Sequence, residues 1–173
     1  GERGRGGLDR LWARPSADVN GLWGGYAGPG SKTVIAAEAG AKVSFRLVPG
    51  QDPAAVVQSF RDFVQARLPP DARAVIEEFG AAPGVEVPSD SRWVQAAREV
   101  LTEEYGRPAV LIGCGGSIPV VESLHRLLGV DSLLMGFGLD DDQVHSPNEK
   151  FDWRCFHHGM RAHARLLGRL AAP

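Results

Sequence analysis

One histidine, one serine and four carboxylates lie close together in the run FGLDDDQVHSPNEK, between positions 137 and 150. The run follows an apolar, strand-like segment at 132–137, and loops at the carboxyl ends of strands in α/β proteins commonly bind ligands or metals. His145 precedes a rigid turn, where a fixed neutral imidazole suits a metal ligand, although a histidine on a polar loop is usually just exposed. A zinc site takes three or four protein ligands, and no His-x-Asp motif precedes this histidine. The loop is therefore either a solvated acidic turn or part of a metal site whose other ligands lie elsewhere.

The other polar residues of this run have simpler interpretations. Asp140-Asp141-Asp142 lacks the glycine and the trailing glutamate of an EF-hand calcium loop, so a solvated loop tip is favoured. Glu149 either orients the loop by accepting backbone N–H bonds or caps the helix that follows, and capping is the favoured role.

Two more places carry groups that suit ligand binding. Gly116 and Ser117 open a predicted helix, where backbone N–H groups and a hydroxyl bind anions or polarise a carbonyl. An ordinary serine N-cap explains them equally well. Arg46, with Thr33 before it, presents a guanidinium fork and a hydroxyl to a carboxylate, whereas an exposed arginine on a strand usually only improves solubility.

Composition limits the classes of partner. The chain has 173 residues, an apolar fraction of 43%, a charged fraction of 23% and a net charge of −2, as in ordinary globular proteins. Nothing in this balance suggests nucleic acid or an anionic membrane as a partner, and no apolar run reaches the ~18 residues of a membrane span. The two cysteines have no CxxC spacing, which favours reduced thiols and a cytoplasmic location.

The chain divides by composition into three parts. Residues 1–16 begin with a Gly/Arg-rich tract and are predicted to be a flexible or truncated segment. Residues 17–88 are predicted to form a small α+β unit and residues 89–173 an α/β unit, each with fewer layers than a self-contained domain needs. A strand is predicted within 17–28, and a second extended run is predicted to start at 33–35 and to alternate along 41–48. Further strands are predicted at 72–79, 110–112 and 133–137. Helices are predicted after Asp52-Pro53, from a cap at Ser89 to 105, from the segment 115–119 to 128 and from 152 to 170.

Five ordered motifs resemble the di-zinc metallopeptidases of the carnosinase, aminoacylase and carboxypeptidase G type, and most of all the broad bacterial dipeptidases. The resemblance runs from Leu11 onward, with one departure at Ala36, where the family usually has proline. The motifs are GGYAGPGSKTVI at 24–35, FRLVPGQ at 45–51, GGSIPV at 115–120, GFG at 136–138 and HSPNEK at 145–150.

The resemblance implies an incomplete two-domain metallopeptidase of the α/β class. Residues 17–88 would be part of a lid and dimerisation domain, and residues 89–173 the C-terminal part of the catalytic domain. His145 would be a zinc ligand, and Arg46 would bind the terminal carboxylate of the substrate, assisted by Thr33. Ser117 and the Gly116 backbone would contact the substrate beside the metals.

The resemblance also implies what lies upstream of Gly1. The general base, a glutamate pair and the remaining ligands of two zinc ions are expected there, with manganese or cobalt as alternative metals. The chain alone is expected to hold no metal stably and to be inactive. Its expected partners are a short peptide or N-acyl amino acid, the missing N-terminal portion and a second copy paired through the lid. The alternative is a non-catalytic, lid-derived module that dimerises or binds carboxylates.

Overall fold

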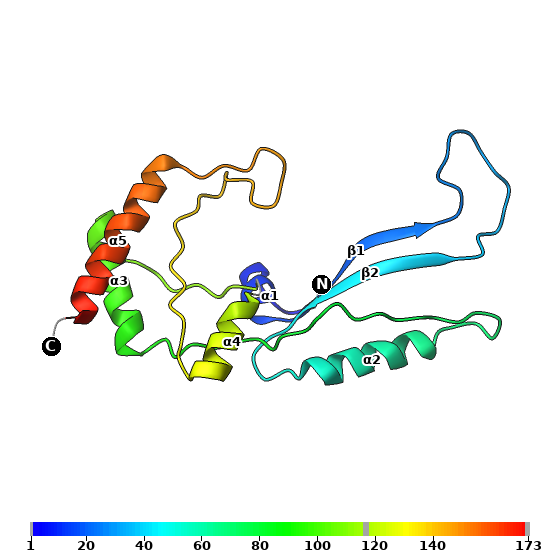
Figure 1. Ribbon diagram of the computed structural model, residues 1–173, viewed down its shortest axis with the longest axis horizontal. Coiled ribbons are helices and arrows are strands. Elements are labelled where there is room, and N and C mark those ends of the chain that lie inside the picture. Colours follow the sequence, from blue (N-terminus) through cyan, green and yellow to red (C-terminus); the bar gives the residue numbers. More distant parts are fainter. Residues whose placement is uncertain (1, 116–117, 172–173) are drawn as a thin grey trace. The chain divides into compact units, whose positions relative to one another are not determined.

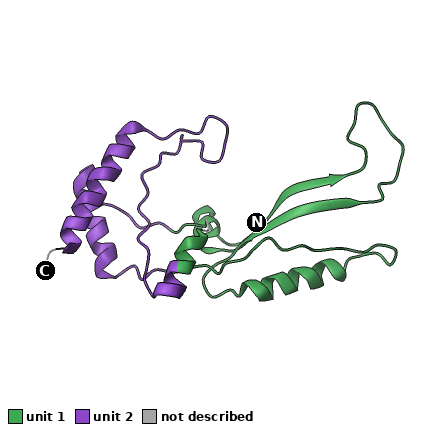
Figure 2. Cartoon of the chain, in the orientation of Figure 1, with its two compact units in different colours: residues 1–86, 113–123 green, residues 87–112, 124–173 purple. Residues whose placement is uncertain are grey.

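The computed structural model describes residues 2–115 and 118–171, which contain five α-helices and one two-stranded sheet (Figure 1). The chain forms two compact units, one of residues 1–86 and 113–123 and the other of residues 87–112 and 124–173 (Figure 2). We call them unit 1 and unit 2. No helix in the described part of the chain combines the length and the apolarity that a membrane crossing requires.

An antiparallel hairpin forms the sheet of unit 1. Strand β1 (Ser16–Gly24) pairs with β2 (Ala39–Arg46), and a bulge lies between Val19 and Gly21. The alternation of side chains confirms a strand within each of the two predicted extended runs. The second strand begins at Ala39, so the prediction that the run starts at Thr33 is wrong. One face carries Ala17, Val43 and Phe45, and the other face carries Ser16, Asp18, Ser44 and Arg46.

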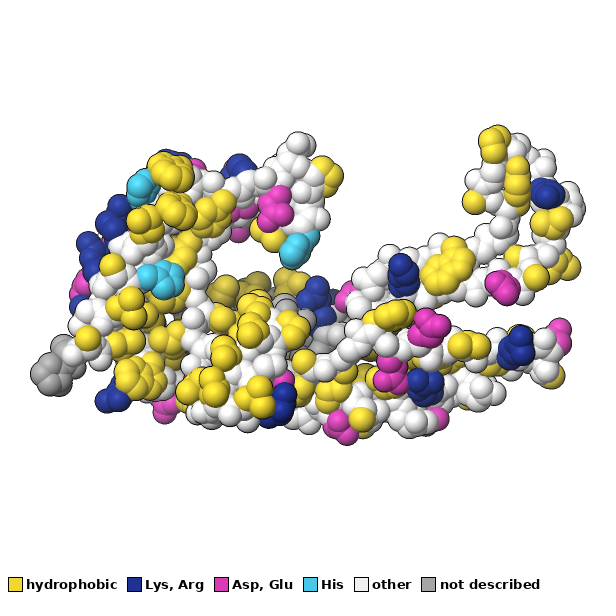
Figure 3. Space-filling view, viewed as in Figure 1, with side chains coloured by type: hydrophobic (Ala, Val, Ile, Leu, Met, Phe, Trp, Pro, Cys, Tyr) yellow, Lys and Arg dark blue, Asp and Glu magenta, His cyan; other side chains and the backbone are white. Residues whose placement is uncertain are grey.

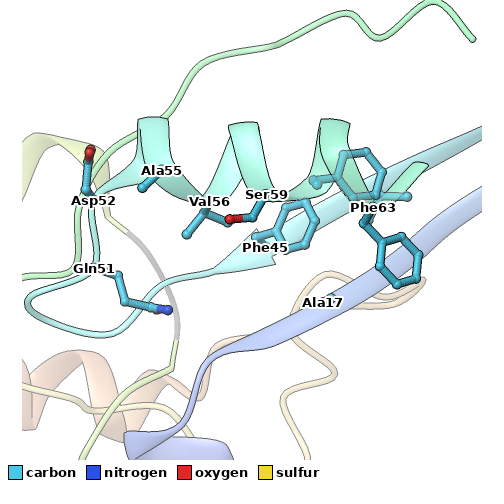
Figure 4. A pocket seen from close by; sticks show the side chains of 10 residues that line it. Ala17, Phe45, Gln51, Asp52, Ala55, Val56, Ser59 and Phe63 are labelled. Carbon is cyan, nitrogen blue, oxygen red and sulfur yellow. The ribbon is translucent and has the colours of Figure 1, made fainter. Parts of the chain in front are cut away.

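Helix α2 (Pro53–Gln65) lies beside the apolar face of the hairpin. As predicted, Asp52 caps the helix, because its carboxylate accepts the N–H of Ala54 at 3.0 Å and proline follows at the first helical position. Phe45 and Phe60 meet edge to face, with ring centroids 5.3 Å apart. A groove of about 670 Å³ remains between helix and sheet, lined mainly by apolar side chains (Figure 4).

The core of unit 2 lies between α3 (Arg92–Tyr105) and α5 (Trp153–Ala171). The buried members of this core recur at helical spacing, which confirms the two predicted helices. They are Ala97, Val100, Ala162 and Leu166, with Leu133, Met135 and Phe137 packed against them. The cap of α3 is Ser91, whose hydroxyl accepts the N–H of Val94, so the prediction of Ser89 as the cap is wrong.

Two more helices complete the described elements. Helix α4 (Pro119–Leu128) confirms the helix predicted after the glycine pair. Helix α1 (Gly7–Ala13) lies within residues 1–16, the segment predicted to be flexible or truncated. The carboxylate of Asp9 accepts the N–H of Gly6 at the start of α1. The sequence did not predict this helix start because glycines precede it.

Three predicted strands are not strands in the structure. Residues 72–79, 110–112 and 133–137 are extended, but none forms a strand ladder with another described segment. Several of their large apolar side chains are well exposed, for example Phe79 at 90%, Val110 at 77% and Leu134 at 61%. In 133–137 only alternate side chains are covered, by the unit 2 core. Apolar periodicity marks a segment as strand-like, whereas a strand also needs a neighbour to accept its backbone hydrogen bonds. Figure 3 shows apolar side chains reaching the surface in both units.

A cluster of charges joins α3 to α5 around Glu104, whose side chain is only 3% exposed. Its carboxylate accepts hydrogen bonds from Arg161 and Arg165 and is 2.7 Å from Nδ1 of His158. The pKa of Glu104 is lowered from 4.5 to about 2, mainly by the hydrogen bond from Arg161 and further by the contact with His158. Burial of the carboxylate acts in the opposite direction.

Truncating the centre of the unit 2 core should destabilise the fold. We expect Val100→Ala to lower the free energy of unfolding by roughly 1–3 kcal/mol, because two fully buried methyl groups are lost and a cavity is left. Val144→Ala, at a side chain 58% exposed, is the control and should change stability by less than about 0.5 kcal/mol. Urea unfolding followed by circular dichroism gives both values, and equal effects would contradict the assignment of the core.

The Glu104 cluster predicts a loss of stability in acid. Because the folded pKa lies below the unfolded value, the carboxylate stabilises unit 2 above pH 4.5 and loses this contribution as the pH falls toward about 2. Glu104→Gln should lower the free energy of unfolding at neutral pH. It should also make that free energy depend less on pH between about 2 and 4.5. Asp140→Asn, at an exposed carboxylate, should leave the dependence unchanged. Denaturant midpoints measured from pH 2 to pH 7 test this, and an unaltered slope in Glu104→Gln would contradict it.

Candidate functional site

Arg46 is the last residue of β2 and lies on the polar face of the hairpin. Strand alternation places its side chain opposite the apolar face that α2 covers, as the sequence predicted. Its Nε is 4.0 Å from Oδ2 of Asp18, and that same oxygen accepts a hydrogen bond from the hydroxyl of Ser16 at 3.0 Å. The side chain is about half exposed, so the guanidinium is held from one side and open to solvent.

The glycine-rich segment before α4 meets Arg46 within unit 1. Nη1 of Arg46 donates a hydrogen bond to the backbone oxygen of Gly115 at 3.2 Å. Only glycine fits at this position, because a Cβ on Gly115 would lie 2.3 Å from the backbone oxygen of Leu11 in α1. Gly116 and Ser117 lie outside the described residues. The structure therefore brings Arg46 to the residue that precedes the predicted substrate-contacting pair.

Thr33 is exposed in the connection between β1 and β2 and is not brought to Arg46. Arg46 pairs with Ser16 at one end of the hairpin, whereas the connection leaves from Gly24 and Ala39 at the other end. Seven residue steps along β2 correspond to roughly 23 Å at about 3.3 Å per residue. The structure therefore does not bring these two side chains together within one chain.

His145 lies in unit 2, on a tight turn with unusual backbone geometry. Its φ is +62°, and Gln143 and Asn148 also have positive φ, at +54° and +63°. Left-handed conformations are strained for residues other than glycine and cluster at functional sites. Backbone hydrogen bonds hold the turn, including Ser146 N–H to Gln143 O at 2.9 Å. The exposed imidazole is therefore presented by a defined backbone.

Glu149 orients this turn and does not cap α5. Its carboxylate accepts the N–H of His145 at 3.3 Å. The capping position belongs to Asp152, whose carboxylate accepts the N–H of Arg154 at 2.8 Å. The favoured prediction of a capping role for Glu149 is wrong because Asp152 stands directly before the first turn of the helix.

Asp142 is buried within this turn and is only 1% exposed. Its carboxylate accepts the N–H of Leu139 at 2.7 Å and bonds Nζ of Lys150 at 2.9 Å, while its backbone oxygen accepts the N–H of Lys150 at 3.0 Å. The hydrogen bond from Leu139, followed by that from Lys150, lowers the pKa of Asp142. The prediction of a solvated loop tip is wrong for Asp142, although Asp140 is exposed.

At least one member of each remaining acidic pair, and most of the other histidines, have polar partners. The chain contains Glu-Glu pairs at 77–78 and 103–104, which are not where the resemblance expects its own pair. Glu78 bonds Arg61, Glu103 bonds Arg169 and Glu104 lies in the charge cluster. Three of the other histidines also have polar partners, namely His125 with Asp131, His158 with Glu104 and His163 with the backbone oxygen of Gly159.

The described residues do not by themselves form a zinc site. Across residues 2–115 and 118–171, no three side chains among His, Cys, Asp and Glu come together as a metal-binding group. Zinc takes three or four protein ligands, and His145 offers one imidazole. A metal at this imidazole needs ligands from outside the described residues.

Comparison with known proteins gives a consistent result. Residues 9–169 match the family described as Peptidase family M20/M25/M40. The Cys-Gly metallodipeptidase of Saccharomyces cerevisiae is 33% identical over 165 residues, which are 92% of this chain and 34% of the yeast protein. The human Beta-Ala-His dipeptidase is 28% identical over 168 residues, which are 95% of this chain and 33% of the human protein.

A solved structure from the same family is also similar to this chain in fold. An M20 family metallo-carboxypeptidase from Sulfolobus solfataricus superposes with a TM-score of 0.79 at 28% identity, over 92% of this chain and 36% of that one. The α/β fold class and the expected family resemblance are confirmed. The chain spans about a third of the length of the curated relatives that it matches.

Removing the Asp142 carboxylate should loosen the turn that presents His145. We expect Asp142→Ala to speed hydrogen exchange at the amides of Leu139 and Lys150 at least several-fold. The Leu139 amide loses the carboxylate that accepts its hydrogen bond. The Lys150 amide bonds the backbone oxygen of residue 142, which is less fixed once the carboxylate and its bond to Lys150 Nζ are gone. Asp140→Ala, at an exposed neighbour, is the matched control. Unchanged exchange at both amides in Asp142→Ala would show that the turn is held by other contacts.

Proposed function

Because the chain belongs to peptidase family M20/M25/M40, we propose that it forms the C-terminal portion of a zinc-dependent dipeptidase. The complete enzyme would hydrolyse short peptides or N-acyl amino acids. The observation that carries this proposal is the exposed imidazole of His145 on a strained, hydrogen-bonded turn supported by buried Asp142. Such a turn fixes a ligand before the metal arrives, which lowers the cost of ordering it on binding.

Arg46 would recognise the substrate. A guanidinium fork pairs with a carboxylate through two parallel hydrogen bonds, so it fixes orientation as well as charge. Its position at the end of β2, beside Gly115, supports a role in gripping the terminal carboxylate. Ser117 and the Gly116 backbone would contact the same substrate. Fixing the substrate in this way lowers the entropic part of the barrier to cleavage.

The metal site would be completed by the upstream portion of the enzyme. Two zinc ions, or manganese or cobalt in their place, would supply an activated water for the hydrolysis. This chain contributes the His145 imidazole, and the other ligands and the general base are expected from the missing portion. We therefore expect the chain alone to hold no metal stably and to be inactive.

The same upstream portion would cover the exposed extended segments. Residues 110–112 are apolar on both faces, as in the central strands of parallel sheets, and Val110, Leu111 and Ile112 are 51–77% exposed here. A strand added beside them would satisfy their backbone groups. Relatives about three times as long as this chain have enough sequence to supply it.

A homodimer through the hairpin unit is part of this proposal. Thr33 and Arg46 lie at opposite ends of one hairpin, so a shared role at one carboxylate requires Thr33 from a second copy. We expect the assembled enzyme to be cytoplasmic. No nucleic acid or membrane partner is proposed.

The second candidate function is a non-catalytic module that dimerises or binds carboxylates. It requires a folded, monodisperse dimer without the upstream portion. The exposed apolar segments argue against it, because Phe79 and Val110 are 90% and 77% exposed, and large apolar surface of this kind promotes aggregation or dye binding.

A chimera tests the proposed function. Residues 9–169 would replace the matching third of the yeast Cys-Gly metallodipeptidase, and hydrolysis of Cys-Gly would be followed with and without chelator. We expect metal-dependent activity, a loss of roughly 100-fold or more in kcat/KM for His145→Ala, and a KM raised roughly tenfold with a smaller change in kcat for Arg46→Lys.

His157→Ala is the matched control for the histidine variant. His157 packs against Trp153 on α5 and should tolerate the change with activity close to that of the parent chimera. A chimera that folds and binds two metal ions per chain, yet cleaves neither dipeptides nor N-acyl amino acids, would contradict the proposal.

A further inference from the structure

The guanidinium of Arg46 has two edges in different environments. Its Nε edge faces Asp18, with Oδ2 at 4.0 Å, and Nη1 donates to the backbone oxygen of Gly115 at 3.2 Å. A carboxylate binds an arginine through two adjacent N–H groups on one edge. The edge that includes Nη1 thus binds the neutral backbone oxygen of Gly115, and the Nε edge faces the carboxylate of Asp18.

Asp18 is placed beside Arg46 by the register of the hairpin. Ser16 pairs with Arg46 and Asp18 pairs with Ser44, so Asp18 and Arg46 are diagonal neighbours on the polar face. Diagonal neighbours lie within reach of long side chains. The hydroxyl of Ser16 donates to the Asp18 oxygen that faces Arg46, at 3.0 Å, and thereby fixes that carboxylate.

From this arrangement we infer that Asp18 is a positioning residue for Arg46, orienting the guanidinium through an ion pair at Nε so that the edge formed by Nη1 and Nη2 receives the terminal carboxylate of the substrate. Gly115 O marks the place of that carboxylate and is displaced from Nη1 when substrate binds. The inference rests on the proposed function of Arg46 as the carboxylate grip, and adds to it the residue that orients the grip.

Asp18 has two opposite effects on a carboxylate that binds Arg46, and the inference requires positioning to exceed repulsion. Asp18 repels an incoming carboxylate, but the two anions would lie at different nitrogens of the guanidinium, and both side chains are about half exposed, so water screens the repulsion. An arginine side chain that is free to rotate loses rotamer entropy when it binds, and one already held by Asp18 loses less.

The test has two readouts on the intact chain. The first is the Nε–Hε signal of Arg46 in 15N-resolved NMR, which needs no ligand. The second is the affinity for N-acetylglycine, titrated into the millimolar range, compared with N-acetylglycinamide, which lacks the carboxylate. Four variants are compared with the parent: Asp18→Asn, Asp18→Glu, Arg46→Lys and Asp71→Asn. Asp71 is an exposed carboxylate in the turn after α2 and serves as the control.

We expect Asp18→Asn to shift the Arg46 signal and speed its hydrogen exchange, and to weaken N-acetylglycine binding about two- to fivefold, the range for exposed ion pairs. The affinity for the amide should not change. Asp18→Glu should restore most of the affinity, Arg46→Lys should remove the preference for the acid, and Asp71→Asn should resemble the parent.

The outcomes separate this inference from the proposed function. If the parent chain prefers N-acetylglycine to the amide but Asp18→Asn binds N-acetylglycine as tightly as the parent or more tightly, Asp18 does not position Arg46. The proposed binding of the substrate carboxylate by Arg46 is then unaffected. An unmoved Arg46 signal in Asp18→Asn also overturns the inference. If the signal moves but the parent does not distinguish acid from amide, the carboxylate grip fails, and Asp18–Arg46 is an ordinary surface ion pair.

Discussion

The antiparallel pairing of β1 with β2 is the constraint on which the organisation of unit 1 depends. Its register assigns alternate side chains to opposite faces, so Ala17, Val43 and Phe45 face α2 while Asp18 and Arg46 share the other face. A shift of one residue would bury the arginine against the helix and expose the phenylalanine. The same hydrogen bonds that hold the hairpin therefore decide which side chains can bind a ligand.

Unit 2 presents its candidate ligand by a different physical means. No regular element carries His145, and the turn is instead held by a buried carboxylate that bonds both the backbone at Leu139 and the ammonium of Lys150. Burying Asp142 costs free energy that these hydrogen bonds offset. Each unit thus orients one candidate functional side chain through polar contacts and leaves it open to solvent.

Local patterns in the sequence predicted the elements that are stabilised locally. The hairpin strands and helices α2, α3, α4 and α5 follow from apolar periodicity and from caps such as Asp52. Segments 72–79, 110–112 and 133–137 were expected as strands, but a strand depends on a neighbour whose position no local pattern reveals. Helix α1 was missed because its first residues resemble a flexible tract.

The candidate site residues stay predictions, and the sequence alone did not predict what surrounds them. The motif order indicates His145 and Arg46, but not their surroundings, because Arg46 and Gly115 are 69 residues apart in sequence and meet only after folding. Asp142 looked like part of a solvated acidic run, and its burial depends on Lys150, eight positions later. The acidic run did contain one signal of this, since a lysine follows it at a spacing that closes a turn.

The central claim is that His145 is a ligand in a metal site that spans this chain and an upstream portion. Zinc-edge anomalous diffraction from crystals of the chimera with the yeast enzyme tests it most directly. The account predicts a zinc ion about 2.0–2.1 Å from an imidazole nitrogen of His145. A fully occupied metal site whose ligands do not include His145 would contradict the account.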